Sequence, residues 1–433
     1  MTILNLPTWL LDNLEQNSSR PEPTWLANFR GHHREDCLKT GLSRQRNEHW
    51  KYTNLACLEK IKCSAAAPVA IMEKSIHDSI KARRLVHSES IFLVCINGFY
   101  APQFSDLTHL PHHVIVCSLQ QALAKHAELL QTYWLQQIHA ECYPFASLNA
   151  SLANDGLFLY VAGELTLPIH ILWLMTDHQE CVAHSQQIIV LEKESKAYLL
   201  EEHIAAIHAK HVMNMVTSIT ISAGAHLEYY KYRHESKKNI HFAHTMIQQQ
   251  ENSFLNHVNY SSSNLFARDD LLVKLNHLGA HCTTSGFYRL QHDGHQVNHH
   301  VDIEHRAPSG RSEMLYKGIV EKKSQAVFSG RVHVTQQAEK TVAQQANHHL
   351  LLDNQAEAYS KPELEIYADD VKCQHGATTG EVDQDAVFYL CSRGISYQDA
   401  LNILLQGFAD EIMQRVAHVA IRKHIQNDEV AVI

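Results

Sequence analysis

A short turn of small or polar residues recurs along the middle of the chain, each time with an apolar run before it and a strand-like run after it. The copies begin at Ser195, Gly224, Asn252, Gly279, Ser324 and Gln355. Their first positions lie 29, 28, 27, 45 and 31 residues apart. Near-constant periods of this length are typical of solenoids and propellers, in which each unit buries its apolar face only against its neighbours. The repeat therefore limits the fold to stacked, similar units.

The residues beside these turns alternate as they do in strands. Ile219 and Ile221 share one face of a predicted strand, and Thr220 and Ser222 share the other. Because this alternation accompanies the repeat, we predict a mainly β protein whose body is a β-solenoid. A β-sandwich with similar hairpin spacing is the alternative that the pattern leaves open.

Changes in the hydrophobic pattern divide the 433 residues into three regions. Residues 1–145 mix helical patterns with short apolar runs, which predicts an N-terminal α/β region. Within it, the helical pattern that begins at Leu119 is expected to end at Pro144. Residues 146–375 carry the repeat and form the predicted β core. Residues 376–433 return to helical patterns and form a predicted C-terminal helical domain.

The C-terminal region is predicted to contain two helices with polar caps. Asp383 can cap a short helix, and Ser396 can cap a longer one. Apolar residues recur in the longer helix at steps of three and four, which gives it an apolar stripe. The stripe consists of Leu401, Leu404, Leu405, Phe408, Ile412 and Val416. Because the stripe lies beyond the solenoid repeat, we predict that it binds a partner, with ordinary core burial as the alternative.

Composition argues against several classes of partner and site. The net charge is −9 at pH 7 and the basic residues are scattered, so we expect neither a nucleic acid nor a membrane surface as the main partner. No run approaches the roughly 18 apolar residues of a membrane span, and residues 1–14 do not resemble a signal peptide, which predicts a cytoplasmic protein. The ten cysteines include no Cys-x-x-Cys pair, so we expect reduced thiols and no zinc or cluster cage made by this chain alone.

Cys373 and His375 form the pair with the clearest metal-binding chemistry. If the segment is extended, both side chains face the same side, where a thiolate and an imidazole can reach one metal ion. A buried thiol beside a hydrogen-bonded histidine is the alternative. The chain also has 34 histidines, and the run from Asn298 to His305 contains His, Asp and Glu within one strand length. That run would indicate a histidine-rich β-fold metalloenzyme instead.

Longer motifs resemble a known protein family. The run from Pro362 to Thr378, PELEIYADDVKCQHGAT, and the run FYLCSRGI from Phe388 resemble the C-terminal signature of the SufB/SufD family of iron–sulfur cluster assembly proteins. Residues 46–53 resemble the N-terminal motif of that family. Further segments match its core in order, at 145–149, 168–169, 316–319, 327–330, 340–341 and 350–352.

This resemblance implies a right-handed parallel β-helix between an N-terminal region and a C-terminal helical domain. It also implies a non-enzymatic scaffold subunit of a SufBCD complex that assembles and delivers iron–sulfur clusters. The stretch Asn347-His348-His349 lacks the cysteine that SufB-type chains carry before the apolar triplet, which favours the SufD type. A SufB-type paralogue is the alternative. ATP hydrolysis would belong to a partner, because the chain lacks the Gly-x-x-x-x-Gly-Lys-Ser/Thr phosphate loop.

Two partners are implied by the resemblance, together with a homodimer when the chain is isolated. A SufB-like paralogue would pair through the strand that contains Leu364 and Ile366. His375, with Cys373, would supply ligands for iron or a nascent cluster at that interface, transiently and shared with the paralogue, so that the chain alone holds no cofactor. A SufC-like ATPase would bind the stripe residues Leu401, Leu405, Phe408 and Ile412.

Overall fold

The protein is described here by a computed structural model. It describes residues 6–16, 22–42, 48–69, 74–85, 89–134, 138, 142–176, 180–205, 210–262 and 264–430. Residues 46 and 47 of the N-terminal motif lie outside the described residues. Within the described parts of the chain, every helix is too short or too polar to span a bilayer.

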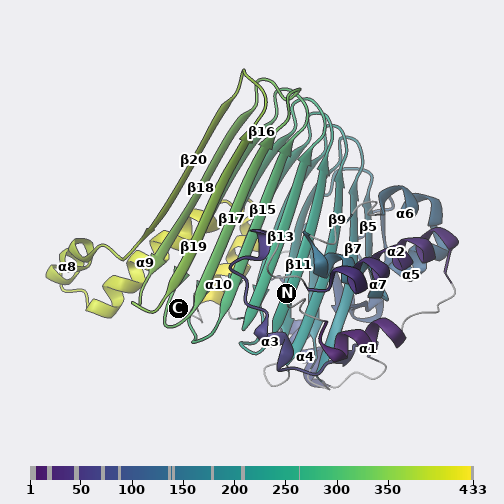
Figure 1. Ribbon diagram of the computed structural model, residues 1–433, viewed down its shortest axis with the longest axis horizontal. Helices are drawn as coiled ribbons and strands as arrows, with labels where there is room; N and C mark the ends of the chain where they lie inside the picture. The colour runs from purple at the N-terminus through teal and green to yellow at the C-terminus, as the bar shows by residue number, and fades with distance from the viewer. Residues whose placement is uncertain are drawn as a thin grey trace.

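The body of the molecule is a solenoid of two facing sheets (Figure 1). From β5 onward, successive strands alternate between the sheets, and each strand pairs in parallel with the strand two positions along the chain. Each coil therefore adds one strand to each sheet, and the solenoid makes about seven turns. Strands make up 44% of the structure and helices 26%. The predicted mainly β solenoid, with an N-terminal α/β region and C-terminal helices, is confirmed, and the β-sandwich alternative is wrong.

The two sheets have the following strands. Sheet A contains β4 (Val114–Ser118), β5 (Asp155–Val161), β7 (Cys181–Leu191), β9 (His211–Ile221), β11 (Ile240–Gln249), β13 (Phe266–Leu275), β15 (Gln296–His305), β17 (Gln325–Val334) and β19 (Glu357–Ile366), with β1 (Ser64–Ala65) beside β7. Sheet B contains β3 (Phe99–Tyr100), β2 (Ile91–Ile96), β6 (Ile169–Met175), β8 (Lys196–Ala205), β10 (His226–His234), β12 (Phe254–Ser262), β14 (His281–Leu290), β16 (Arg311–Val320), β18 (Val342–Leu351) and β20 (Lys372–Gly380).

Helices cover the outer faces of the sheets. The helices are α1 (Thr8–Gln16), α2 (Thr24–Thr40), α3 (Ala56–Glu59), α4 (Lys74–Ala82), α5 (Leu119–Lys125), α6 (Ala127–Tyr133), α7 (Pro144–Leu152), α8 (Gln384–Ser392), α9 (Tyr397–Met413) and α10 (Val419–Val430), with short 3₁₀ turns at Glu48–Trp50 and Pro102–Phe104. The N-terminal helices α1, α2 and α7 lie along the earlier coils, whereas α8 extends away from the last strands (Figure 1).

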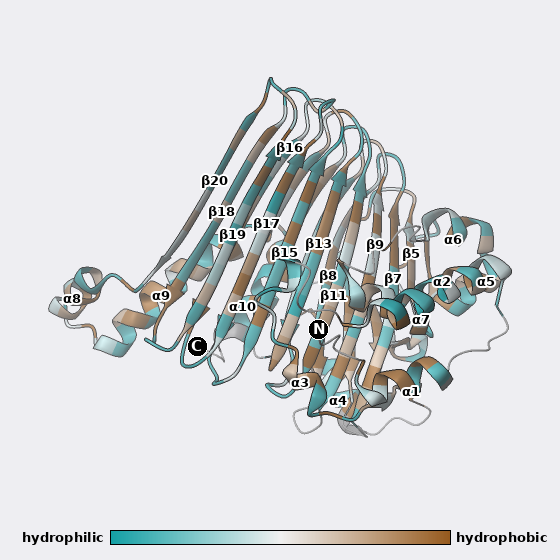
Figure 2. Cartoon of the chain, in the orientation of Figure 1, coloured by the Kyte–Doolittle hydropathy of each residue, from teal (hydrophilic) through white to brown (hydrophobic). Residues whose placement is uncertain are grey.

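Side chains that alternate between the two faces of each strand form three layers of core. Hydrophobic and hydrophilic residues alternate along many strands in Figure 2. Ile189 and Leu191 belong to the cluster between the sheets. Phe242 belongs to a cluster under α1 and α7, and Tyr260 belongs to a cluster under α9 and α10. The strands are therefore buried on both faces, as expected for a parallel sheet covered by helices.

The repeat has a backbone signature at its turns. One residue with positive φ stands before each strand of sheet B from β8 to β18, at intervals of 27 to 31 residues. These residues are Glu194, Gly224, Asn252, Gly279, Ser309 and Lys340. The left-handed conformation favours Gly and Asn, so the copies with Glu, Ser and Lys are difficult to recognise by residue type. This explains the irregular predicted spacing of 45, which runs from a sheet-B turn at Gly279 to a sheet-A turn at Ser324 and misses Ser309.

Two predicted boundaries differ from the structure. Pro144 begins α7 rather than ending a helix, because the missing N–H and fixed φ of proline suit the first helical position. The helical pattern from Leu119 is divided into α5 and α6. At the other end of the core, β20 continues to Gly380, so the strand passes the predicted boundary after residue 375 and α8 begins at Gln384.

Candidate functional site

The C-terminal end of the solenoid presents unpaired strand edges. β19 and β20 are the last strands of the two sheets, and each pairs with a neighbour on one side only. The amides of Glu357 and Tyr367 donate to sheet A at 3.0 and 2.9 Å. Because amides alternate in direction along a strand, those of Leu364 and Ile366 point toward the open edge. The two residues predicted at a paralogue interface therefore lie on an available edge.

Cys373 and His375 lie on this same end of the solenoid, on β20. They stand opposite Ala343 and Gln345 of β18, two positions apart and on one side of the strand. Cys373 is half-buried against the core between the sheets, and burial raises the pKa of its thiol. His375 is exposed.

Neither Cys373 nor His375 joins a group of three metal-ligating side chains among the described residues. Any metal bound there needs ligands from elsewhere. The adjacent Gly376 has open space around the position of a Cβ atom. The structure places the pair together but does not test its predicted role.

The apolar stripe on α9 faces the solenoid instead of solvent. Leu405 and Ile412 are buried, and they belong to one cluster with Phe287 and Leu315 of sheet B. Leu401 and Phe408 are partly buried against that cluster. The buried members of the stripe therefore fit the alternative of ordinary core burial, because the helix folds back and covers the outer face of sheet B.

A different set of apolar residues on α8 and α9 is exposed. Phe388 is 73% exposed, and Tyr389, Tyr397 and Ile403 are also open to solvent. Helical spacing does not identify these residues, because the apolar periodicity of α9 marks its buried face. Phe388 and Tyr389 did stand in the sequence as adjacent aromatic residues within the C-terminal signature. We call Phe388, Tyr389, Tyr397 and Ile403 the exposed apolar set.

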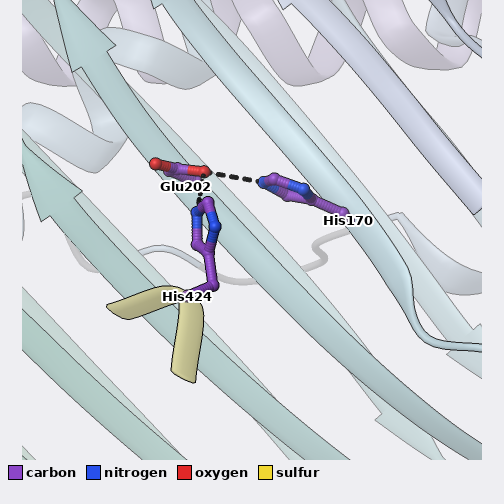
Figure 3. A group of neighbouring side chains, drawn as sticks. All are labelled: His170, Glu202 and His424. Carbon is purple, nitrogen blue, oxygen red and sulfur yellow. Dashed lines mark hydrogen bonds and ion pairs between the residues drawn. The ribbon is translucent and has the colours of Figure 1, made fainter. Parts of the chain in front are cut away.

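A buried histidine–carboxylate group lies between sheet B and α10, as Figure 3 shows. His170 of β6 and His424 of α10 approach the same oxygen of Glu202 on β8, with Nε2–Oε2 distances of 2.8 and 3.0 Å. The other oxygen of Glu202 pairs with Arg83 at 2.6 Å. This group was not predicted from sequence, because its members lie on three elements that are separated along the chain.

The electrostatics of this group follow from burial and from its partners. Burial alone would raise the pKa of Glu202, but hydrogen bonds from His170 and His424 and the charge of Arg83 outweigh burial and hold that pKa below its usual range. Burial lowers the pKa of His170. The group therefore combines an ionised carboxylate with a neutral imidazole.

A second group of this kind, His203, Glu235 and His241, is buried in the body. The only groups of three ligand side chains among the described residues are these two, and neither includes a residue of the run from Asn298 to His305. The neighbours His299 and His300 diverge, toward Tyr288 and toward His49 respectively. The described residues therefore give no support to a metalloenzyme site on β15.

The fold and its open end define a parallel β-solenoid protein with unpaired terminal strands and helices on its outer faces. Two family models cover most of the chain: the SufBD protein N-terminal region matches residues 10–171, and the SufBD core domain of SUF-system iron–sulfur cluster assembly matches residues 174–408. The chain belongs to the SufBD family of iron–sulfur cluster assembly proteins, which confirms the predicted family.

Similar proteins cover nearly the whole chain. The iron–sulfur cluster assembly protein SufD of Escherichia coli is 30% identical over 91% of this chain and 90% of its own length. An iron–sulfur cluster assembly SufBD family protein of Synechocystis is 30% identical over 87% of this chain and 84% of its own length. The SufD protein of Bacillus subtilis is 22% identical over 93% of each chain. The predicted likeness to SufD agrees with these relatives.

Proposed function

We propose that this chain is a SufD-type scaffold subunit that pairs with a SufB-like paralogue and binds a SufC-like ATPase during iron–sulfur cluster assembly. The observation that carries the proposal is the match to both regions of the SufBD family, together with relatives named SufD that align over about nine-tenths of the chain. In this proposal the chain is not an enzyme, ATP hydrolysis belongs to the partner, and the complex works in the cytoplasm.

The open edges of β19 and β20 support pairing with the paralogue. An unpaired strand edge supplies a row of donors and acceptors for a strand of another chain. Leu364 and Ile366 lie on the β19 edge, while Cys373 and His375 lie on the neighbouring β20. A partner docked at this end would bring its own side chains beside the thiol and the imidazole, which are suitable ligands for iron. Iron or a nascent cluster would then be shared cargo of the two chains.

The exposed apolar set supports binding of the ATPase. Aromatic residues that are open to solvent on a projecting helix are suited to bury themselves in a partner. This set replaces the stripe of α9 as the expected contact, since Leu405 and Ile412 already have partners in sheet B.

Co-purification of the three proteins tests the proposal. We expect Phe388→Glu combined with Tyr397→Glu to release the ATPase while the paralogue stays bound, because the two contacts lie on separate elements. Val419→Glu is the matched control, as Val419 is 53% exposed but lies on α10 outside the exposed apolar set. Retention of the ATPase by the double variant would contradict the α8–α9 contact. Failure of the wild-type chain to bind either partner would contradict the proposed function.

A further inference from the structure

We propose that His170, Glu202 and His424 bind one divalent transition-metal ion, Zn(II) or Fe(II), which fastens the C-terminal helix α10 to sheet B. This site lies on the outer side of sheet B and is separate from the strand end that carries Cys373 and His375. It is a property of the chain alone and does not rest on the proposed function.

The three ligand atoms are already gathered. All three lie within 4.8 Å of one another, and both imidazole nitrogens lie 2.8 to 3.0 Å from the carboxylate oxygen. Tetrahedral ligands at about 2.0–2.1 Å from a zinc ion stand about 3.3 Å apart. Relative to the Glu202 oxygen, each nitrogen therefore needs to move by only a few tenths of an ångström. Figure 3 shows both rings directed at the same end of the carboxylate.

Neighbouring side chains fix the carboxylate that would bind the ion. Arg83 holds the other oxygen of Glu202 at 2.6 Å and also pairs with Asp428 at 2.7 Å. Tyr232 donates to Asp428 at 2.5 Å. Such outer partners orient metal ligands and strengthen binding. Since Glu202 and His170 are fully buried on adjacent paired strands, their positions are also fixed by the sheet.

A cavity reaches the group at His424. The cavity measures about 820 Å³, and its lining includes Arg83, His424 and Asp428. Three protein ligands beside a cavity leave a fourth coordination position for water, as in open zinc sites. The group of His203, Glu235 and His241 is less suitable, because all three of its residues are buried and none of them lines this cavity.

The donor set selects the class of metal. Two imidazoles and one carboxylate suit Zn(II) and Fe(II), whereas Mg(II) and Ca(II) prefer oxygen ligands. The ion would join two strands to the last helix, so its binding should also slow the opening of α10. Without an ion, the three side chains hold the same two strands and helix together by hydrogen bonds alone. The experiment must distinguish this alternative from metal binding.

Metal binding by the purified full-length chain tests the proposal. Wild type, His424→Ala, Glu202→Gln and His418→Ala are titrated with Zn(II), with Fe(II) under anaerobic conditions and with Mg(II), and bound metal is counted after dialysis. His418→Ala is the matched control, since His418 lines the same cavity but is outside the ligand group. We expect wild type and His418→Ala to hold one equivalent of Zn(II) or Fe(II) more than the other variants. The Zn(II) and Fe(II) arms show which ion binds more tightly.

The affinity and the helix give two independent readouts. Removal of one ligand should weaken binding more than about 100-fold, because loss of an outer partner alone costs about 10- to 100-fold. The ion should also slow hydrogen exchange in α10 of wild type and of His418→Ala, but not of Glu202→Gln. His424 is 9% exposed on the last helix, so its replacement is expected to leave the body folded, and circular dichroism checks this. Equal metal content and equal exchange in wild type, Glu202→Gln and His424→Ala would overturn the proposal.

Discussion

Replacing Ile412 with alanine tests whether the apolar stripe holds α9 to sheet B. Ile412 has no exposed surface and packs in one cluster with Phe287 and Leu315. Truncation of a buried isoleucine to alanine costs about 2–5 kcal/mol. Since about 1.4 kcal/mol corresponds to a tenfold change in an equilibrium constant, local opening of α9 should become about 30- to 4,000-fold more frequent. Hydrogen exchange of the α9 amides measures this change directly.

The same substitution at Ile403 provides the control. Ile403 lies on the same helix but is 49% exposed, and alanine has the higher helix propensity. Its replacement should change the free energy of opening by less than about 0.5 kcal/mol, or about twofold in exchange. If both variants exchanged alike, the stripe would not be the surface that docks α9, and our account of its burial would be wrong.

Three further outcomes are expected. Ile366→Pro should weaken pairing with a SufB-like partner about 2- to 12-fold, because it removes one outward N–H whose hydrogen bond is worth about 0.5–1.5 kcal/mol. The hydrogen bonds of β19 to its own sheet stay intact. An unchanged Kd of the heterodimer would place the contact elsewhere. In reconstituted complexes, His375→Ala should lower iron and acid-labile sulfide more than Cys373→Ser, which is nearly isosteric; wild-type loading of the histidine variant would reject a ligand role. Burial lowers the pKa of His305 to about 4, below its ordinary value of 6.5. Between these two pH values the unfolded state binds a proton that the folded state does not, so the free energy of unfolding should fall as pH decreases from 6.5 to 4. His305→Asn should reduce the slope of unfolding free energy against pH by about one proton, as measured by urea denaturation across this range.

The solenoid could be predicted from sequence because the residues that define each coil are close together along the chain. Each coil repeats a turn and two alternating strands, so the period appears even where the residues differ. The turn before β16 was missed because Ser309, rather than glycine or asparagine, adopts the left-handed conformation there. Pro144 was misread for a related reason: proline can follow one helix or begin the next, and only the surrounding chain decides which.

The sites depend on contacts that sequence periodicity does not describe. Helical spacing identified the stripe of Leu405 and Ile412, but a stripe has the same pattern whether it packs on its own sheet or on another protein. His424 meets Glu202 across 222 positions of sequence, so no local motif could indicate their group. Cys373 and His375 were recognised because two positions along a strand are enough to bring their side chains to one side.

The two ends of the solenoid differ in a way that bears on partner choice. At the N-terminal end, the sheets terminate in the antiparallel strands β3 and β4, of which β3 spans only Phe99–Tyr100. At the C-terminal end, β19 stays open, but it carries Lys361, Pro362, Glu363 and Glu365. Charged residues and proline on an edge discourage pairing with an arbitrary strand. Pro362 lacks an N–H where the alternation of β19 directs that group outward, so the missing donor falls on the open edge. A partner strand must therefore place no acceptor opposite Pro362 and must match the charges beside it, which makes this edge selective as well as available.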